Sequence, residues 1–350
     1  MAGRGSPHNV DHRFSGRQIL AVDDGWPQTA QPEFELPAPQ TQVREIQARS
    51  IISHNLSPDV PFSRAINPYQ GCEHGCIYCY ARPSHAYLEL SPGLDFETRL
   101  FAKINAAELL RREFAKPGYQ PQTIVLGANT DPYQPIEHHY RLTRELLEVM
   151  LAHRHPVGLI TKSAMILRDL DLLQALAERG LCRIMISVTT LDEPLRRRLE
   201  PRASTGQGRL AVIDKLARAG IPVGVLAAPM IPRLNESELE QIIGAAALRG
   251  ASQAGYILLR LPHELAPLFC DWLDRHYPQK KQAILNQLRA SREGALNSPQ
   301  FGDRMRGSGP FADLLAQRFR LICKRLGLAQ RPPPLDITAF LRPHQQFELF

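Results

Sequence analysis

Short apolar runs alternate with amphipathic stretches between residues 63 and 261 of this 350-residue chain. The apolar runs predict strands at 63–69, 123–127, 156–162, 182–188, 222–227 and 254–261. Helical periodicity predicts a helix that begins after Asn105 and further helices at 144–153, 167–179, 205–219 and 236–249. This alternation is typical of an α/β fold whose parallel strands are joined by right-handed crossovers. An open doubly wound sheet and a partial barrel both fit the pattern.

Residues typical of helix N-caps and C-terminal ends predict where the helices begin and end. Asn105 occupies an N-cap position with Glu108 three residues later, a spacing typical of a capping box. Gly180 and Gly220 follow two of the later helices, and glycine readily ends a helix in the left-handed conformation. The segment 96–103 is predicted to be extended.

Polar or small residues stand at the carboxyl ends of several predicted strands, where parallel sheets and barrels bind their ligands. The second strand is followed by the polar loop 129–131, and Lys162 ends the third strand. Ser187 ends the fourth strand, and Ala228 follows the fifth. Because these ends share one rim of a parallel sheet, we expect their side chains to face one site. In the same region, Glu200 and Arg202 are spaced for an internal ion pair.

Three of the six cysteines lie within eight residues, directly after the first predicted strand: Cys72, Cys76 and Cys79. A secreted disulfide framework would space its cysteines along the chain. A closed zinc site needs a fourth ligand, and a thioredoxin-like pair needs only Cys76 and Cys79. Three thiolates without a fourth suit a 4Fe-4S cluster with one open iron, and zinc or a purely structural cluster remains the alternative.

The pattern Cys72-x3-Cys76-x-Tyr78-Cys79 resembles the signature of the radical S-adenosylmethionine (SAM) superfamily. The resemblance spans about residues 60–265 and implies a partial (β/α)6 TIM-like barrel. It also implies an enzyme in which a 4Fe-4S cluster binds SAM at its open iron. An electron from a donor such as flavodoxin or ferredoxin would cleave SAM to methionine and a 5'-deoxyadenosyl radical. That radical would abstract hydrogen from a substrate.

A narrower resemblance is to spore photoproduct lyases and to a bacterial family often labelled DNA repair photolyase-like. It rests mainly on the segments 67–82, 129–135, 161–163 and 304–309, together with Ser187. It implies that SAM is bound by Asn129, Thr130, Lys162, Ser187 and Ala228. The same resemblance makes Tyr80 the candidate catalytic residue. Lyases carry a hydrogen-donating cysteine at the end of the second strand, where this chain has Ala128 and Asn129, so the reaction outcome is not implied.

Three regions are expected. Residues 1–48 are rich in Pro, Gly and polar residues and are predicted to be mostly disordered. Residues 49–265 form the predicted radical SAM core domain. Residues 266–350 form a basic C-terminal extension, with helices predicted at 264–275, 280–292 and 311–326. Between the last two helices, the glycine-rich loop 301–310 carries two arginines that could hold a phosphate.

The formal net charge of +7 is concentrated near the C-terminus, since residues 275–331 contain twelve Lys or Arg and three acidic residues. This segment is compatible with a nucleic-acid partner or with a solvated helical face. No stretch approaches the roughly 18 uncharged apolar residues of a membrane span, and no secretory signal pattern is seen. We therefore expect a cytoplasmic location. The rival to an enzyme is a non-catalytic nucleic-acid-binding protein with a structural metal site.

Overall fold

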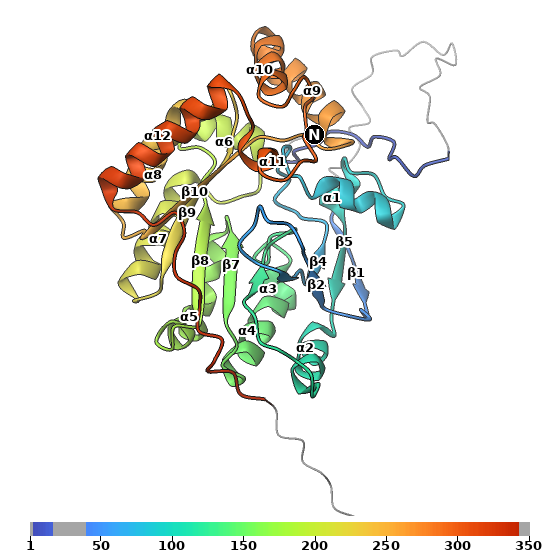
Figure 1. The fold of residues 1–350 in the computed structure, drawn as a ribbon. Coiled ribbons are helices and arrows are strands. Elements are labelled where there is room, and N and C mark those ends of the chain that lie inside the picture. The colour runs from blue at the N-terminus through green and yellow to red at the C-terminus, as the bar shows by residue number, and fades with distance from the viewer. Residues whose placement is uncertain (1–2, 17–39, 343–350) are drawn as a thin grey trace, which may run out of the picture.

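A seven-stranded sheet forms the centre of the computed structural model, which describes residues 3–16 and 40–342 (Figure 1). The strand order is β10-β9-β8-β7-β6-β3-β2. The bounds are β2 Ile52–His54, β3 Arg64–Ile66, β6 Ile124–Leu126, β7 Val157–Thr161, β8 Cys182–Ser187, β9 Val223–Met230 and β10 Gln253–Leu258. Within this sheet, the six strands β3, β6, β7, β8, β9 and β10 run parallel to one another, and β2 is antiparallel to β3.

The order of the parallel strands decides between the two architectures predicted from the sequence. The six strands from β3 to β10 follow one another across the sheet in chain order, without the reversal that defines a doubly wound sheet. Helices connect them in the manner of a barrel that stops after six strands. The predicted partial (β/α)6 TIM-like fold is therefore confirmed.

Helices cover the outer side of this sheet (Figure 1). Their bounds are α2 Ala106–Ala115, α3 Glu137–Tyr140, α4 Leu142–Ala152, α5 Leu170–Ala177, α6 Glu193–Leu199, α7 Gly206–Arg218 and α8 Leu239–Ala247, with 3-10 turns η2 Ala164–Asp169 and η3 Glu236–Glu238. Each main helix buries one apolar stripe, as Leu146 and Met150 do in α4. These stripes and the strands form one large apolar core.

A small second sheet carries the cysteine segment. It has the order β1-β5-β4, with bounds β1 Gln42–Ile46, β4 Tyr69–Gln70 and β5 Arg99–Lys103. The segment 63–69, expected to be one strand, is divided between β3 in the large sheet and β4 in the small one. The segment expected to be extended at 96–103 begins in the short helix α1, Asp95–Thr98, before it enters β5.

Asn105 stands at the N-cap position of α2, but its side chain makes no capping hydrogen bond. Its amide pairs instead with the backbone of Ala48, donating to Ala48 O and accepting from Ala48 N at 2.9 Å. The side chain thus fixes the loop between β1 and β2 rather than the helix end. In contrast, Thr205 caps α7 by accepting from Gly208 N.

The region expected to be mostly disordered, residues 1–48, lies partly outside the described residues, over 1–2 and 17–39. Its described parts make specific contacts. Gly5 N and Ser6 N donate to the carboxylate of Glu97 at 2.9 and 2.8 Å, and Ser6 is fully buried. Residues 42–46 form β1 and pair with β5. Buried hydrogen bonds with Glu97 offset part of the entropy cost of ordering so polar a segment.

The C-terminal region is helical, as predicted. Its helices are α9 Leu265–His276, α10 Pro278–Ala290, α11 Asp303–Arg306 and α12 Pro310–Leu326. Helix α12 packs beside α8, with Arg318 bound to Glu240. The ring of Phe319 lies tilted against that of Tyr256 in β10, with 4.8 Å between the ring centroids. Helices α9 and α10 form a second core with the segment around Ile77. No helix among residues 3–16 and 40–342 is both long and apolar enough to cross a membrane.

Candidate active site

The cysteine segment leaves β4 through Gly71 and is held on both sides by backbone hydrogen bonds. Gly71 has φ +75°, and a Cβ there would meet the Leu100 side chain at 2.5 Å, so the tight turn requires glycine. Cys72 N donates to Phe96 O at 2.9 Å, and Ile77 N donates to Leu199 O at 3.0 Å. Helices α1 and α6 thus fix the direction of the segment.

Arg82 supports the same segment from within. Its fully buried guanidinium donates to Cys76 O at 2.8 Å and forms an ion pair with Glu97. It also donates to the carbonyls of Pro92 and Gly93. Since Glu97 in turn accepts from residues 5 and 6, the N-terminal segment is tied to the cysteine segment through one buried carboxylate.

A single cavity of about 420 Å³ lies at the carboxyl ends of the parallel strands. All the residues predicted from the sequence to form the site line it: Cys72, Cys76, Cys79, Tyr80, Asn129, Thr130, Lys162, Ser187 and Ala228. The lining is mostly apolar, with few polar groups that point inward. This is the composition expected of a small-molecule site.

The three thiols are free, with no disulfide among the described cysteines, and Cys72 and Cys76 are buried. Burial raises the pKa of Cys72 well above its ordinary value and that of Cys76 to about 11, although the charge of Lys162 partly offsets the second shift. Thiolates at these positions need compensating positive charge, which iron would supply. The donor set therefore fits a cluster held by three cysteines.

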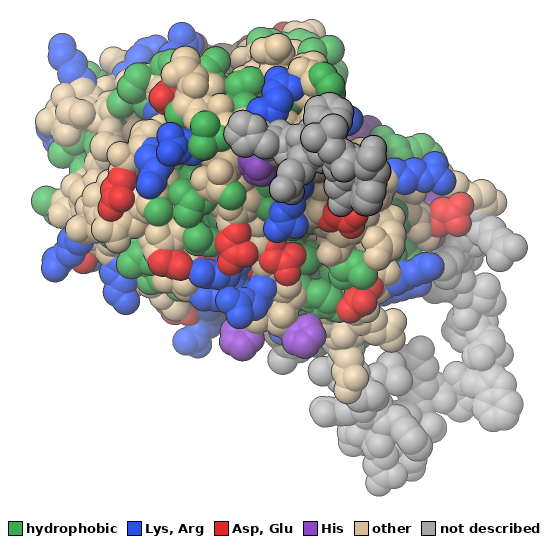
Figure 2. All heavy atoms as spheres, turned by 90° about the horizontal axis from the view of Figure 1, so that it is seen from below, with side chains coloured by type: hydrophobic (Ala, Val, Ile, Leu, Met, Phe, Trp, Pro, Cys, Tyr) green, Lys and Arg blue, Asp and Glu red, His purple; other side chains and the backbone are tan. Residues whose placement is uncertain are grey.

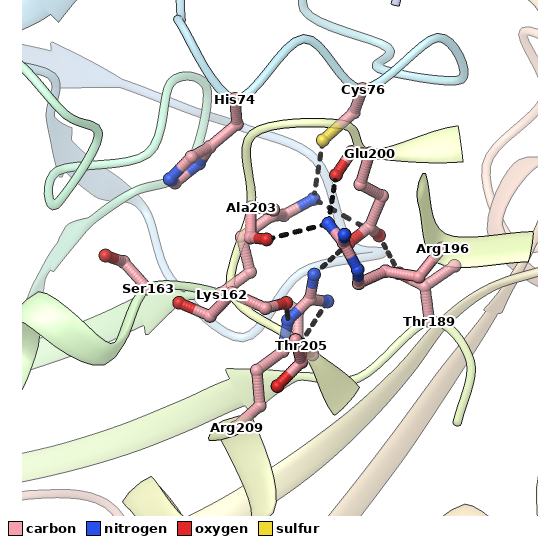
Figure 3. A network of polar contacts seen from close by, with 12 residues as sticks. His74, Cys76, Lys162, Ser163, Thr189, Arg196, Glu200, Ala203, Thr205 and Arg209 are labelled. Carbon is pink, nitrogen blue, oxygen red and sulfur yellow. Dashed lines mark hydrogen bonds and ion pairs between the residues drawn. The ribbon is translucent and has the colours of Figure 1, made fainter. Parts of the chain in front are cut away.

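Lys162 lies beside Cys76 (Figure 3). Its Nζ is 3.2 Å from Cys76 Sγ, 3.0 Å from Tyr78 Oη and 4.0 Å from the carboxylate of Glu200. The ammonium also lies 5.1 Å from the centre of the Tyr78 ring. These neighbours raise the pKa of Lys162 despite the opposing effect of burial, so the side chain carries its charge at neutral pH.

Glu200 is the centre of a buried polar network behind the cavity (Figure 3). Its carboxylate pairs with Arg209 and accepts hydrogen bonds from Tyr78 and Thr189. Burial alone would raise the pKa of Glu200, but the charges of Arg209 and Lys162 lower it to about 2. Arg209 also donates to Ser187 O at 3.0 Å, which joins the network to the end of β8.

The ion pair expected between Glu200 and Arg202 does not form. Arg202 binds Glu73 instead, at 3.2 Å, while Glu200 turns inward to Arg209. The Glu200 side chain is fully buried, whereas that of Arg202 is 37% exposed, so a spacing of two residues does not bring them together.

Asp131 is fixed by hydrogen bonds rather than exposed as a free acid or base. Its carboxylate accepts from Thr161 Oγ1 at 2.7 Å and from Lys162 N at 3.0 Å, and it lies 3.5 Å from His74 Nδ1. These partners lower its pKa to about 2 against the effect of burial. Asp131 thus holds the ends of β6 and β7 together.

The remaining predicted residues differ in how their polar atoms are used. The hydroxyl of Thr130 donates to Tyr69 O at 2.9 Å, and Asn129 N donates to the Asn67 side chain at 3.0 Å. Tyr80 is 42% exposed, and its hydroxyl donates to Ala128 O. Tyr80 thus lines the cavity while part of its side chain reaches solvent.

Several lining residues were not predicted from the sequence, among them Arg260 and Met305. Arg260 comes two residues after β10, a position that the rule of carboxyl-terminal strand ends could have indicated. The loop expected to hold a phosphate also reaches the cavity through Arg304. That arginine is bound to Asp59 and Ser57, so its guanidinium is already occupied by protein groups.

Residues 66–246 match the Radical SAM superfamily. An uncharacterized protein of Mycobacterium tuberculosis (strain H37Rv) is 34% identical over 288 residues, which cover 82% of each chain. An uncharacterized protein of Methanocaldococcus jannaschii is 25% identical, over 70% of this chain and 88% of that protein.

Solved structures of spore photoproduct lyase are similar to this chain. The lyase complexed with dinucleoside spore photoproduct aligns with a TM-score of 0.60 at 18% identity, covering 82% of this chain and 80% of the lyase. A lyase mutant with bound AdoMet and dinucleoside spore photoproduct has the same TM-score at 19% identity. At these identities the likeness is one of fold.

Proposed function

The chain belongs to the Radical SAM superfamily and is an enzyme of that class, and from this premise we propose that it acts on nucleic acid through a 4Fe-4S cluster held by Cys72, Cys76 and Cys79. The observation that carries the proposal is the single cavity lined by the three thiols and by every residue predicted to bind SAM. The alternative, a non-catalytic nucleic-acid-binding protein with a structural metal, does not agree with membership of this superfamily.

When bound, the cluster and SAM supply reductive cleavage to methionine and a 5'-deoxyadenosyl radical, which abstracts hydrogen from the substrate. The chain itself holds and orients these groups. Lys162 places a positive charge next to Cys76 and offsets negative charge on the thiolates and on the SAM carboxylate. Glu200 and Arg209 keep Lys162 and Tyr78 in place from behind.

The SAM contacts remain as predicted: Asn129, Thr130, Lys162, Ser187 and Ala228. Since the hydroxyl of Thr130 binds Tyr69 O, Thr130 would meet SAM through its backbone and methyl group. Tyr80 remains the candidate catalytic residue, because its ring lines the cavity next to Cys79. An electron donor such as flavodoxin or ferredoxin would reduce the cluster.

Two observations support a nucleic-acid substrate. The fold resembles that of a lyase solved with a dinucleoside photoproduct. Among the cations of residues 275–331, Lys281, Arg304 and Arg318 form ion pairs and Arg292 binds backbone carbonyls. Arg275 and Lys324 are exposed, although Arg275 also donates to Asp271 O. The helices of this C-terminal region lie in the upper part of Figure 1. On the face seen from below, basic and acidic side chains are mixed (Figure 2).

The substrate assignment is tested by tracing the abstracted hydrogen. Reconstituted, dithionite-reduced protein is incubated with SAM and with oligonucleotides deuterated at the sugar or at the thymine methyl group. We expect deuterium in 5'-deoxyadenosine from one of these oligonucleotides. 5'-Deoxyadenosine that forms without deuterium from any of them would remove nucleic acid as the hydrogen source while leaving the radical SAM chemistry intact.

A further inference from the structure

Arg260 is the feature of the cavity that the chemistry described so far does not use. It follows β10 and lines the same cavity as the cysteines and Tyr80. The guanidinium carbon lies 4.9 Å from the centre of the Tyr80 ring, a cation–π arrangement. Arg260 makes no hydrogen bond or ion pair with any residue among 3–16 and 40–342.

The other cations that line the cavity are occupied by protein groups. Lys162 contacts Cys76, Tyr78 and Glu200. Arg304 binds Asp59, whose carboxylate also accepts from Gly302 N at 2.6 Å. The charge of Asp59 acts to raise the pKa of Arg260, but the two side chains form no ion pair. Of the lysines and arginines that line the cavity in the described part of the chain, Arg260 alone forms no hydrogen bond or ion pair with a protein group.

This free guanidinium is costly where it stands. Burial lowers the pKa of Arg260, and the neighbouring charge of Arg304 acts in the same direction. A charge removed from water without a partner is unfavourable unless a ligand supplies one. An anion that entered the cavity mouth would satisfy the donors of Arg260 and relieve its repulsion with Arg304.

The surroundings hold Arg260 ready for such a ligand. Fully buried Arg292 donates to the carbonyls of Leu258 and Leu259 at 3.0 and 2.8 Å and to Arg304 O at 3.0 Å. It thus ties the end of β10, from which Arg260 projects, to α11. On the other side, Tyr80 is fixed by its hydrogen bond to Ala128 O. The guanidinium is therefore positioned before any substrate arrives.

We propose that Arg260 binds a phosphate group of the substrate at the mouth of the cavity, an inference that rests on the proposed function. The planar guanidinium offers two parallel donors that match two oxygens of a phosphate. The half-exposed ring of Tyr80 beside it provides an aromatic surface of the kind on which a base stacks. A nucleotide unit presents both groups within one residue.

The test compares two dinucleotide probes that differ in one charge. Thymidylyl-thymidine carries a phosphodiester, and its methylphosphonate analogue is neutral. Binding of each to the reconstituted protein with SAM is measured by calorimetry at fixed ionic strength, for wild type, Arg260→Ala and Arg260→Lys. The control variant is Arg218→Ala, because Arg218 is 80% exposed on α7 and lies outside the cavity.

We expect wild type and Arg218→Ala to bind the phosphodiester about 10- to 100-fold more tightly than the neutral probe, the range of a charged hydrogen-bonded contact. Arg260→Ala should lose that ratio while still binding the neutral probe, and Arg260→Lys should keep part of it. An unchanged ratio in Arg260→Ala, or wild type that binds neither probe, would overturn the proposal. Displacement of the phosphodiester by glutarate but not by inorganic phosphate would overturn it in favour of a carboxylate.

Failure of this inference is distinguishable from failure of the proposed function. Protein that cleaves SAM but shows no charge-dependent binding of the dinucleotide leaves the radical chemistry standing and removes the role of Arg260. Protein that binds the phosphodiester through Arg260 but yields no 5'-deoxyadenosine would support the role of Arg260 and contradict the proposed function.

Discussion

At the scale of single residues, Glu200 connects the cysteine segment with the sheet. Its carboxylate accepts hydrogen bonds from Tyr78 of the cysteine segment and from Thr189, which follows β8. It also forms an ion pair with Arg209 of α7. All four side chains are buried. In such a network, loss of one charge leaves its partners unsatisfied in a medium of low polarity.

Glu200→Gln should therefore lower the free energy of unfolding by about 3 kcal/mol, because Arg209 would remain charged and buried without a carboxylate. The measurement is chemical denaturation of the apoprotein. Glu193→Gln is the matched control, since Glu193 binds Arg196 and Arg197 on the partly exposed side of α6. A loss of at most about 1 kcal/mol is expected there. Equal losses in the two variants would contradict this account of the network.

His155 gives a prediction about pH. It is fully buried against Phe114, with Nδ1 donating to Pro156 O at 3.0 Å and Nε2 accepting from Tyr119 Oη at 2.7 Å. Burial lowers the pKa of His155 to about 3. Below its ordinary pKa of 6.5 the unfolded chain takes up a proton that the folded chain does not, so stability falls as pH falls.

Between pH 7 and pH 5 this single group should reduce the free energy of unfolding by about 2 kcal/mol. His155→Gln keeps a neutral hydrogen-bonding side chain and should remove that part of the pH dependence. Denaturation curves of both proteins at the two pH values provide the test. The same pH dependence in His155→Gln would contradict this account, because it would mean that His155 titrates alike in the folded and unfolded states.

At the scale of elements, each strand contributes to the site through the residues directly after it. The turn that follows β6 depends on Gly127, which has φ +89° and whose Cβ would meet Ile160 O at 2.1 Å. The obstacle is the backbone of β7, which cannot move without disturbing the sheet. This turn positions Asn129, Thr130 and Asp131.

Gly127→Ala should destabilise the protein by more than about 1 kcal/mol, since alanine is strained at positive φ and meets the neighbouring strand. Gly118→Ala is the matched control, because a Cβ at that glycine has no atom within 4 Å. Thermal unfolding of both variants distinguishes them. If Gly127→Ala unfolds at the wild-type temperature, the turn is not constrained as described.

Periodicity in the sequence was enough to predict the six parallel strands and their helices, because local apolar patterns determine which face of an element is buried. It did not predict that 63–69 would be divided between two sheets. That division depends on pairing with β5, some thirty residues later, which no local pattern encodes. The local pattern also predicted that Asn105 caps a helix. Its side chain binds Ala48 instead, a contact between residues far apart in the sequence that no local pattern encodes.

At the scale of the whole molecule, segments from both ends of the chain surround the cysteine segment. Gly5 packs against Gly75, where a Cβ on Gly5 would meet the carbonyl oxygen at 1.7 Å. Arg13 binds Glu264 at the start of α9, and Trp272 of α9 donates to Arg198 O at 3.0 Å. The described N-terminal residues and the C-terminal helices thus support the candidate site together with the barrel.

Gly5→Val should displace residues 3–10 and increase hydrogen exchange in residues 72–79 by about tenfold or more, because the cover over that segment would open locally. Gly16→Val is the matched control in the same segment, as a Cβ there meets no atom within 4 Å. Exchange in α4 should remain unchanged in both. Equal exchange at 72–79 in the two variants would show that this packing does not protect the cysteine segment.

The candidate site was predictable from the sequence to the extent that its residues fall into local patterns. The cysteine spacing, the polar residues at strand ends and the resemblance to spore photoproduct lyases together led to nine residues that line one cavity. The place of Arg260, Arg304 and Met305 in the cavity was not predicted, although the loop that carries Arg304 was expected to hold a phosphate, because the packing of C-terminal segments over a barrel depends on long-range contacts. Arg292 fixes that arrangement by donating to four backbone carbonyls. No local pattern in the sequence around Arg292 indicates this role.

The central claim, that the three cysteines hold a cluster that cleaves SAM, is tested most directly by measuring 5'-deoxyadenosine. Wild type, Cys76→Ala and Cys270→Ala are reconstituted anaerobically with iron and sulfide, reduced with dithionite and given SAM. Cys270 lies on α9 outside the cavity and serves as the matched control. We predict 5'-deoxyadenosine and methionine from wild type and from Cys270→Ala, and none from Cys76→Ala. Wild-type protein that takes up iron but forms no 5'-deoxyadenosine, or Cys76→Ala that forms as much as wild type, would contradict the claim.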